Sequence, residues 1–149
     1  DAGHEVFRFD AAFHDVHPCI GCDRCRREGV CTFAADDMKR LNPHLLAAEA
    51  VVFVSPIYYF DLSAQLKAVI DRFYANDDAL HGGKRALLLT AMADEDLGAA
   101  EGADTTFRSI CAYLQWENAG ILNAAGASTA EDLTEEDLRR AYDLGKDLK

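Results

Sequence analysis

The sequence predicts an α/β fold with a doubly wound parallel sheet, and three observations lead to this prediction. Short apolar runs alternate with amphipathic stretches along the chain. The runs AVVFV at 50–54 and RALLLT at 85–90 are typical of strands buried on both faces. Between them, residues 62–76 carry apolar side chains at helical spacing. Such alternation of strand and helix favours parallel strands joined by helical crossovers.

Local signals predict the elements before the first of these strands. Glu5–Phe9 reads as a strand, because EVFRF is flanked by Gly3 and Asp10. A loop over 10–35 is long enough to suggest a function or an ordering ligand. After it, Asp36 is expected to cap a short helix that ends near Leu41. Asn42 and Pro43 then have the residue types that begin a second helix.

The elements after the first buried strand follow in the same way. Residues 55–61 form a loop at its carboxyl end, and 81–83 (HGG) form a turn. An acidic loop at 91–103 is expected to present a solvated face that includes Asp104, and a helix spans 104–115. Residues 120–123 form a weaker strand. Thr134 begins the last helix, with Asp137 in the capping-box position.

Composition and charge narrow the functional class. The chain has 149 residues, enough for the single domain that we expect over 1–149. Its net charge of −11 would repel a polyanion, so nucleic acid is not an expected partner. Neither an apolar run of membrane-spanning length nor a signal-peptide pattern is found, although the chain begins at Asp1 without a methionine. We therefore expect a cytoplasmic protein with no membrane partner.

Cysteine usage points to metal or redox chemistry. Four of the five cysteines (Cys19, Cys22, Cys25 and Cys31) fall within 13 residues, whereas Cys111 lies on an apolar helix face. Thiolates at three-residue steps resemble the spacing of Fe–S ligands more than that of zinc ligands. Four thiolates are enough for a [4Fe–4S] cluster. Free or structural thiols, a zinc site and a redox disulfide remain alternatives.

Two longer motifs resemble a known family. The run SPIYYFDLSAQLKAVIDRFY, Ser55 to Tyr74, resembles the NAD(P)H-dependent FMN reductases and related flavodoxin-like proteins. The run PCIGCDRCRREGVCTFAADDM, Pro18 to Met38, is similar to the cysteine-bearing branch that includes the iron-sulfur flavoproteins. The resemblance implies a flavodoxin-like sheet in the order 2-1-3-4-5. Strand 1 and the phosphate-binding loop of that fold are missing from this sequence. Roughly 30 further upstream residues, one strand-loop-helix unit, are expected in the natural chain.

The resemblance also implies a flavin site at the carboxyl ends of two strands. Residues that match the family's flavin-lining positions, largely through main chain, are Ser55, Pro56, Ile57, Tyr58, Tyr59 and Phe60. The next strand end adds Ala91, Met92 and Ala93, which are expected to approach the flavin from its other side. No catalytic side chain is expected, because the cofactor carries the chemistry.

The implied function is an oxidoreductase that passes electrons from NADH or NADPH through bound FMN. The acceptor would be a small molecule: a quinone, an azo or nitro compound, free flavin or a metal ion. One alternative is an iron-sulfur flavoprotein that transfers electrons through FMN and a [4Fe–4S] cluster. Another is a regulatory or scaffold domain that has lost the flavin. The family commonly closes its flavin site against a neighbouring subunit, so we expect a homodimer or tetramer.

Overall fold

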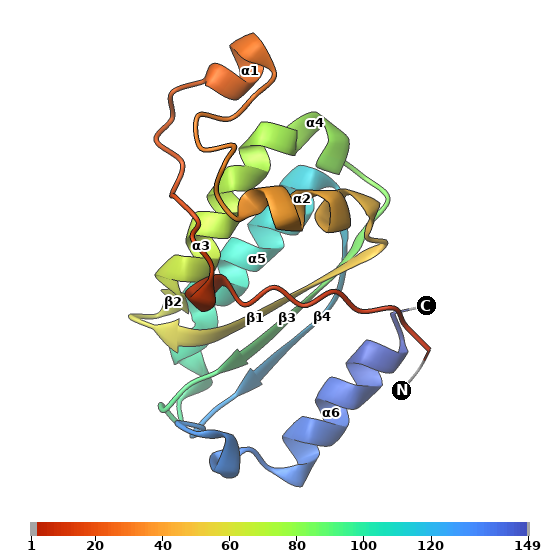
Figure 1. The fold of residues 1–149 in the computed structure, drawn as a ribbon. Coiled ribbons are helices and arrows are strands. Elements are labelled where there is room, and N and C mark those ends of the chain that lie inside the picture. The colour runs from red at the N-terminus through yellow and green to blue at the C-terminus, as the bar shows by residue number, and fades with distance from the viewer. Residues whose placement is uncertain (1–2, 149) are drawn as a thin grey trace. The chain divides into compact units, whose positions relative to one another are not determined.

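The computed structural model describes residues 3–148, which group into two compact units (Figure 1). The first unit contains the chain up to Glu5, the segment Glu49–Ser63 and everything from Gly82 onward. The second unit contains Val6–Ala48 and Ala64–His81. The single domain that the sequence predicts stays a prediction. None of the described helices is both long and apolar enough to cross a membrane.

The first unit is built on a four-stranded sheet in the order β2-β1-β3-β4. Its strands are β1 (Ala50–Tyr58), β2 (Asp61–Leu62), β3 (Arg85–Ala91) and β4 (Glu117–Ala124). β1, β3 and β4 are parallel, which confirms the predicted parallel sheet, and β2 returns antiparallel to β1. β1 runs past the predicted loop boundary as far as Tyr58, because Ser55 and Pro56 still pair with β3.

Two helices of this unit lie on opposite faces of the sheet (Figure 1). α5 (Glu101–Leu114) places Phe107 edge-on against Phe53 of β1, with ring centroids 5.9 Å apart. α6 (Glu135–Lys146) packs on β4, where the side chain of Leu144 lies over Gly120. Helices on both faces are the arrangement that the strand-helix alternation predicts. The prediction that Thr134 caps the last helix is confirmed, because Thr134 and Asp137 exchange hydrogen bonds in a capping box.

One face and one edge of β1 remain open. Val52 is 43% exposed and Val54 67% exposed on the face that α6 leaves uncovered. On the edge away from β3, the only pairing of β1 among residues 3–148 is that of Ile57 and Tyr58 with β2. The predicted strand at Glu5–Phe9 is wrong, since these residues make no ladder in the described structure. Strand propensity alone does not form a strand when no partner supplies the hydrogen bonds.

The second unit is made of short helices. They are η1 (Ala11–Phe13), α1 (Arg24–Glu28), α2 (Met38–Ala47), α3 (Ala64–Asp71), η2 (Arg72–Asn76) and α4 (Asp77–Leu80). The predicted break at Asn42 is wrong, because α2 continues through Pro43 at the loss of one backbone hydrogen bond. The predicted helix over 62–76 is α-helical over α3 and tightens into η2 over its last five residues, and Leu62 belongs to β2. Residues 81–83 form the predicted turn, in which Gly82 and Gly83 both have positive φ.

Candidate functional site

The structure brings the two predicted flavin-lining segments to one edge of the sheet. The parallel ladder pairs Ser55 with Thr90 and Pro56 with Ala91. Residues 55–60 and 91–93 therefore leave neighbouring strands at the same carboxyl edge. In doubly wound sheets, ligands bind outside this edge. Flavin binding by these residues stays a prediction, and the geometry supplies the site that it needs.

A tight aromatic turn ends β1. Tyr58 pairs with Asp61, and the two residues between them have left-handed backbone, with φ of 48° at Tyr59 and 69° at Phe60. Two-residue hairpin turns with positive φ at both central positions normally use Asn or Gly. Bulky aromatic residues are strained there, and such strain concentrates at ligand-binding sites. The aromatic turn (Tyr58, Tyr59 and Phe60) thus has the backbone signature of a functional segment.

The three rings of the aromatic turn face solvent. Tyr58 is 62% exposed, Tyr59 99% and Phe60 64%. The turn is held from behind by Ser55, whose Oγ donates to the Pro56 carbonyl at 2.8 Å and accepts from the Ser63 N–H at 2.9 Å. An exposed cluster of rings on a fixed backbone is suited to a flat aromatic ligand.

The segment 91–93 at the end of β3 contains both exposed and buried residues. Ala93 is exposed and Ala91 half-buried, so both small side chains leave room for a ligand at the edge. Met92 is only 3% exposed. Its N–H donates to the Ala124 carbonyl at 3.0 Å, and its carbonyl accepts from Ala127 at 2.7 Å. Because its main chain is already paired, Met92 would support the edge from behind.

A polar network lies beside this edge, and the sequence patterns did not predict it. Thr90 Oγ1 donates to Asn123 Oδ1 at 2.6 Å, and Asn123 Nδ2 donates to Asp104 Oδ1 at 3.1 Å. Asp104 also pairs with Arg108 at 3.1 Å, and its side chain is only 14% exposed. The expectation that Asp104 is a solvated acid is therefore wrong. Its i,i+4 spacing to Arg108 was the available signal, whereas the link to Asn123 depends on how α5 packs beside β4.

Replacing Phe60 by glycine is expected to stabilise the fold by about 0.5–1 kcal/mol, because relief of left-handed strain exceeds glycine's larger loss of chain entropy. FMN affinity should fall at the same time, since a ring is removed from the predicted site. Urea unfolding and FMN titration measure the two effects. Phe13→Gly is the matched control: Phe13 is 86% exposed and lacks positive φ, so this change should destabilise. Loss of stability in Phe60→Gly would contradict the strain.

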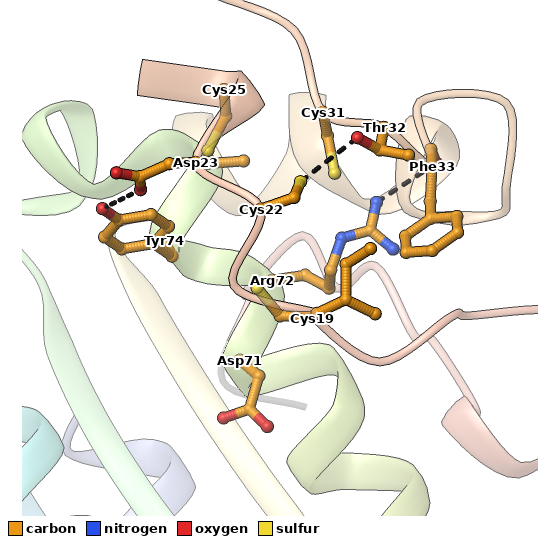
Figure 2. A pocket seen from close by; sticks show the side chains of 12 residues that line it. Cys19, Cys22, Asp23, Cys25, Cys31, Thr32, Phe33, Asp71, Arg72 and Tyr74 are labelled. Carbon is orange, nitrogen blue, oxygen red and sulfur yellow. Dashed lines mark hydrogen bonds between the residues drawn. The ribbon is translucent and has the colours of Figure 1, made fainter. Parts of the chain in front are cut away.

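The second predicted site lies in the second unit, where all four clustered cysteines line one cavity (Figure 2). The cavity measures about 20 Å³, which is room for a single water molecule. Among residues 3–148, no three His, Cys, Asp or Glu side chains converge as a metal site requires. This arrangement does not fit a [4Fe–4S] cluster. The cluster stays a prediction that would require the cysteine loop to open.

Cys22 has the most specific surroundings of these thiols. Its Sγ lies 3.2 Å from Thr32 Oγ1. The hydrogen bond from Thr32 lowers the pKa of the Cys22 thiol, and a backbone hydrogen bond from Arg24 lowers it further. Cys22 is exposed, whereas Cys31 is half-buried. Cys111 is buried in α5, as predicted for a core residue, and burial raises the pKa of its thiol.

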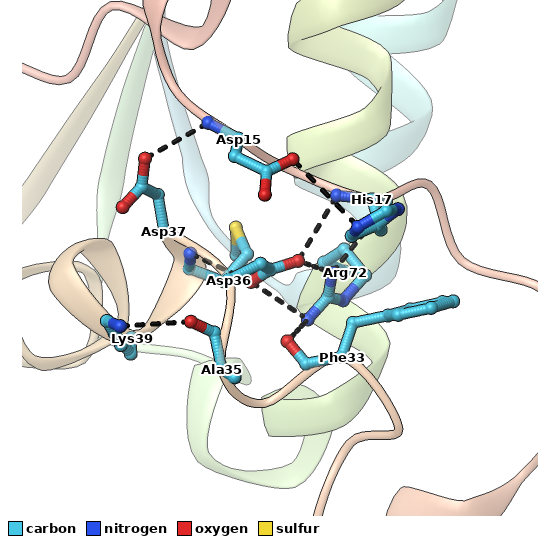
Figure 3. A network of polar contacts seen from close by, with 9 residues as sticks. Asp15, His17, Phe33, Ala35, Asp36, Asp37, Lys39 and Arg72 are labelled. Atoms are coloured by element: carbon cyan, nitrogen blue, oxygen red, sulfur yellow. Dashed lines mark hydrogen bonds and ion pairs between the residues drawn. The ribbon is translucent and has the colours of Figure 1, made fainter.

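A buried ion pair closes the base of the cysteine loop (Figure 3). Arg72 donates to Asp36 at 2.5 Å, and the two side chains are 4% and 2% exposed. Arg72 also donates to the His17 carbonyl at 2.8 Å and the Phe33 carbonyl at 3.2 Å. Asp36 accepts from the main-chain N–H groups of His17 and Met38. Because His17 precedes the first cysteine of the cluster and Phe33 follows the last, this pair fixes both ends of the loop.

A second set of contacts anchors α1, which carries Cys25. Arg26 donates to Asp77 and Asp78, at 2.9 Å in each case, and lies over the ring of Tyr74. The Tyr74 hydroxyl donates to Asp23 at 2.7 Å, and this bond raises the pKa of Tyr74. These side-chain contacts therefore hold α1, and Cys25 with it, in place.

Comparison with known proteins identifies a matching family and sequence relatives of this chain. Residues 1–121 match the family described as NADPH-dependent FMN reductase. An FMN-dependent NADH:quinone oxidoreductase from Methylorubrum extorquens is 32% identical over 126 residues, covering 74% of this chain and 62% of that protein. An iron-sulfur flavoprotein from Methanocaldococcus jannaschii is 35% identical over 72 residues, covering 48% of this chain and 37% of that protein. The matches span less than two thirds of both relatives.

A solved structure shares the fold. The Trp repressor binding protein from Bacillus subtilis superposes with a TM-score of 0.57 at 19% identity, covering 73% of this chain and 72% of that one. At this level of identity the likeness concerns the fold alone, and it agrees with the flavodoxin-like α/β architecture expected from the sequence.

Proposed function

Because this chain belongs to the NADPH-dependent FMN reductase family, we propose that it is an oxidoreductase that binds FMN at the carboxyl edge of β1 and β3. The observation that carries the proposal is the aromatic turn, in which Tyr59 and Phe60 have left-handed backbone and exposed rings. The turn follows the strand end at which Pro56 pairs with Ala91. The residues at this edge fit a flat cofactor, since strained backbone and solvent-facing aromatic rings occur together.

The chain's own contribution is to bind and orient. Main-chain groups of residues 55–60 would meet the polar edge of the flavin, as Ser55 keeps this segment in place. The rings of Tyr58, Tyr59 and Phe60 would exclude water from the flavin's surroundings. Bound FMN supplies the acceptance of hydride from NAD(P)H and the transfer of electrons onward. The Thr90–Asn123–Asp104 network would hold α5 against the strand ends during electron transfer.

A small electron acceptor completes the proposed reaction, and a quinone is the first to test. A relative that covers 74% of this chain is described as an FMN-dependent NADH:quinone oxidoreductase. Azo and nitro compounds, free flavin and metal ions follow as alternatives. A homodimer or tetramer that closes over the exposed aromatic turn, and a cytoplasmic setting, belong to the same proposal.

An anaerobic absorption spectrum of the full-length protein, loaded with FMN, tests the proposal before and after NADPH is added. The flavin band should bleach on addition and return when a quinone is supplied. Tyr59→Ala should weaken FMN binding, whereas Gly145→Ala, on the distant helix α6, should leave it unchanged. A protein that fails to take up FMN would contradict the proposal, as would bound FMN that neither NADH nor NADPH bleaches.

The electron carrier with a [4Fe–4S] cluster on Cys19, Cys22, Cys25 and Cys31 is the second candidate function. It is supported by the description of relatives as iron-sulfur flavoproteins and by the spacing of the cysteines, not by the cavity that they line. Iron and acid-labile sulfide, measured on protein purified without air, distinguish the two candidates. Stoichiometric iron with flavin that NADPH does not bleach would favour the carrier.

A further inference from the structure

The aromatic turn needs support from outside, because its backbone is strained. Left-handed conformations of bulky residues persist only where surrounding contacts hold them, as at Tyr59 and Phe60. The first two turns of α5 supply such contacts. Gly102 lies so close to the Phe60 carbonyl that a side chain there would not fit. One helical turn later, Thr106 Oγ1 donates a long hydrogen bond of 3.4 Å to Asp61 Oδ2, directly after the aromatic turn.

Another side of the same helix is tied to the strand ends. Asp104 comes two residues after Gly102, and two residues rotate an α-helix by about 200°, so the two positions face different ways. Asp104 accepts a hydrogen bond of 3.1 Å from Asn123, whose side-chain oxygen accepts one of 2.6 Å from Thr90. Thr90 and Asn123 pair in the ladder of β3 and β4, next to the carboxyl edge. α5 thus connects the ends of β3 and β4 to the turn that follows β1.

These connections are directional. The Asp104 carboxylate is only 14% exposed, and its second oxygen accepts from Arg108 at 3.1 Å. Thr90 is 5% exposed. Charge-assisted hydrogen bonds in such surroundings fix distance and angle, whereas apolar packing alone would let the helix shift along the sheet. A shift of α5 would move Gly102 and Thr106 with it, and the aromatic turn would lose its support.

We propose that Asp104 is a positioning residue of the flavin site, without itself touching the cofactor. Through Asn123 and Thr90 it fixes α5 on the strand ends, and α5 then fixes the aromatic turn relative to residues 91–93. This role rests on the proposed FMN site, because it concerns the geometry of the two segments that would line it. Asp104 lies outside both of the motifs that resemble the family.

Exchanging the amide and the carboxylate tests this role. Asn123→Asp alone sets two carboxylates against each other, so the FMN dissociation constant should rise about tenfold or more, the typical effect of losing one hydrogen bond to a charged group. In the double variant Asn123→Asp/Asp104→Asn, the amide at position 104 can donate to the carboxylate at position 123, which still accepts from Thr90. The dissociation constant should then return to within about threefold of the original, because the amide oxygen at position 104 can still accept from the half-exposed Arg108.

Leu114→Ala is the control for general destabilisation of α5. Leu114 is 3% exposed and lies at the end of the helix that is remote from the aromatic turn. Loss of its packing should lower the thermal midpoint at least as far as Asn123→Asp does, yet change the FMN dissociation constant by less than about twofold. If Asn123→Asp does not fold, Thr90→Val removes the other bond of the chain while keeping the shape of the side chain, and should weaken FMN binding about twofold to tenfold.

Hydrogen exchange on the protein without flavin separates this role from the flavin site itself. Amides of residues 57–63 and 101–106 should exchange faster in Asn123→Asp, recover in the double variant and stay unchanged in Leu114→Ala. They report the support of the turn whether or not FMN binds, so an original chain that takes up no FMN would contradict the proposed function alone. The positioning role would be overturned by unchanged exchange and affinity in Asn123→Asp, by equal losses of affinity in Asn123→Asp and Leu114→Ala, or by a double variant that does not recover.

Discussion

Asp36→Ala is expected to destabilise the second unit by about 3–5 kcal/mol, the typical effect of removing one partner from a buried ion pair. The change would leave the Arg72 guanidinium buried among the His17 and Phe33 carbonyls with no counter-charge. It would also remove the acceptor of the His17 and Met38 N–H groups. Both ends of the cysteine loop should therefore loosen together.

Thermal unfolding followed by circular dichroism measures this loss, and hydrogen exchange locates it in residues 6–48 and 64–81. Asp143→Ala is the matched control, because it breaks an ion pair with Arg139 whose side chains are 65% and 53% exposed. Exposed pairs of this kind contribute about 0–1 kcal/mol. Asp36→Asn keeps most of the hydrogen-bonding atoms, so its loss of stability should lie between those of Asp36→Ala and Asp143→Ala. If Asp36→Ala costs no more than the control, the ion pair does not organise the loop.

Gly102→Ala is expected to disturb the aromatic turn. A Cβ at Gly102, in the first turn of α5, would lie 2.2 Å from the backbone oxygen of Phe60. Backbone cannot swing aside as a flexible side chain does, so either α5 or the turn must move. Overpacking of this kind typically costs about 1–3 kcal/mol. Because the turn carries the predicted flavin-lining rings, FMN affinity should fall together with stability.

Urea unfolding and FMN titration of the same preparations test this prediction. Gly145→Ala provides the control, since a Cβ there meets nothing within 4 Å inside α6. That change should raise stability by about 0.5–1 kcal/mol, because alanine favours the helix more than glycine does. Gly102→Ala with unchanged FMN affinity would mean that the aromatic turn does not bind the cofactor.

The open face and edge of β1 show what local sequence signals cannot predict about strand pairing and burial. AVVFV correctly predicts a strand, but the expectation that both of its faces are buried is wrong, because Val52 and Val54 are 43% and 67% exposed. EVFRF has similar local character but forms no ladder among the described residues, since a strand exists only through hydrogen bonds to a neighbour. Phe7 instead stacks on the ring of His44, with centroids 3.7 Å apart.

The sequence alone determined the elements whose causes are local. Apolar runs predicted β1 and β3, helical spacing predicted α5, and Thr134 with Asp137 predicted the start of α6. The motif from Ser55 to Tyr74 also predicted a flavin site at residues that the structure places at the carboxyl edge of β1, and flavin binding there stays a prediction. These features depend on residues close together in the chain, so periodicity and capping chemistry are enough to find them.

Only the tertiary structure decided how distant residues combine. The Arg72–Asp36 pair joins positions 36 residues apart, and the Asn123–Asp104 bond joins positions 19 apart. The left-handed backbone of Tyr59 and Phe60 likewise depends on β2 turning back onto β1. Four closely spaced cysteines suggested a metal, but the packing of Arg72 and Thr32 around them leaves a cavity of only about 20 Å³. Spacing specifies which groups are available, whereas packing sets the volume and the hydrogen bonds that decide what they bind.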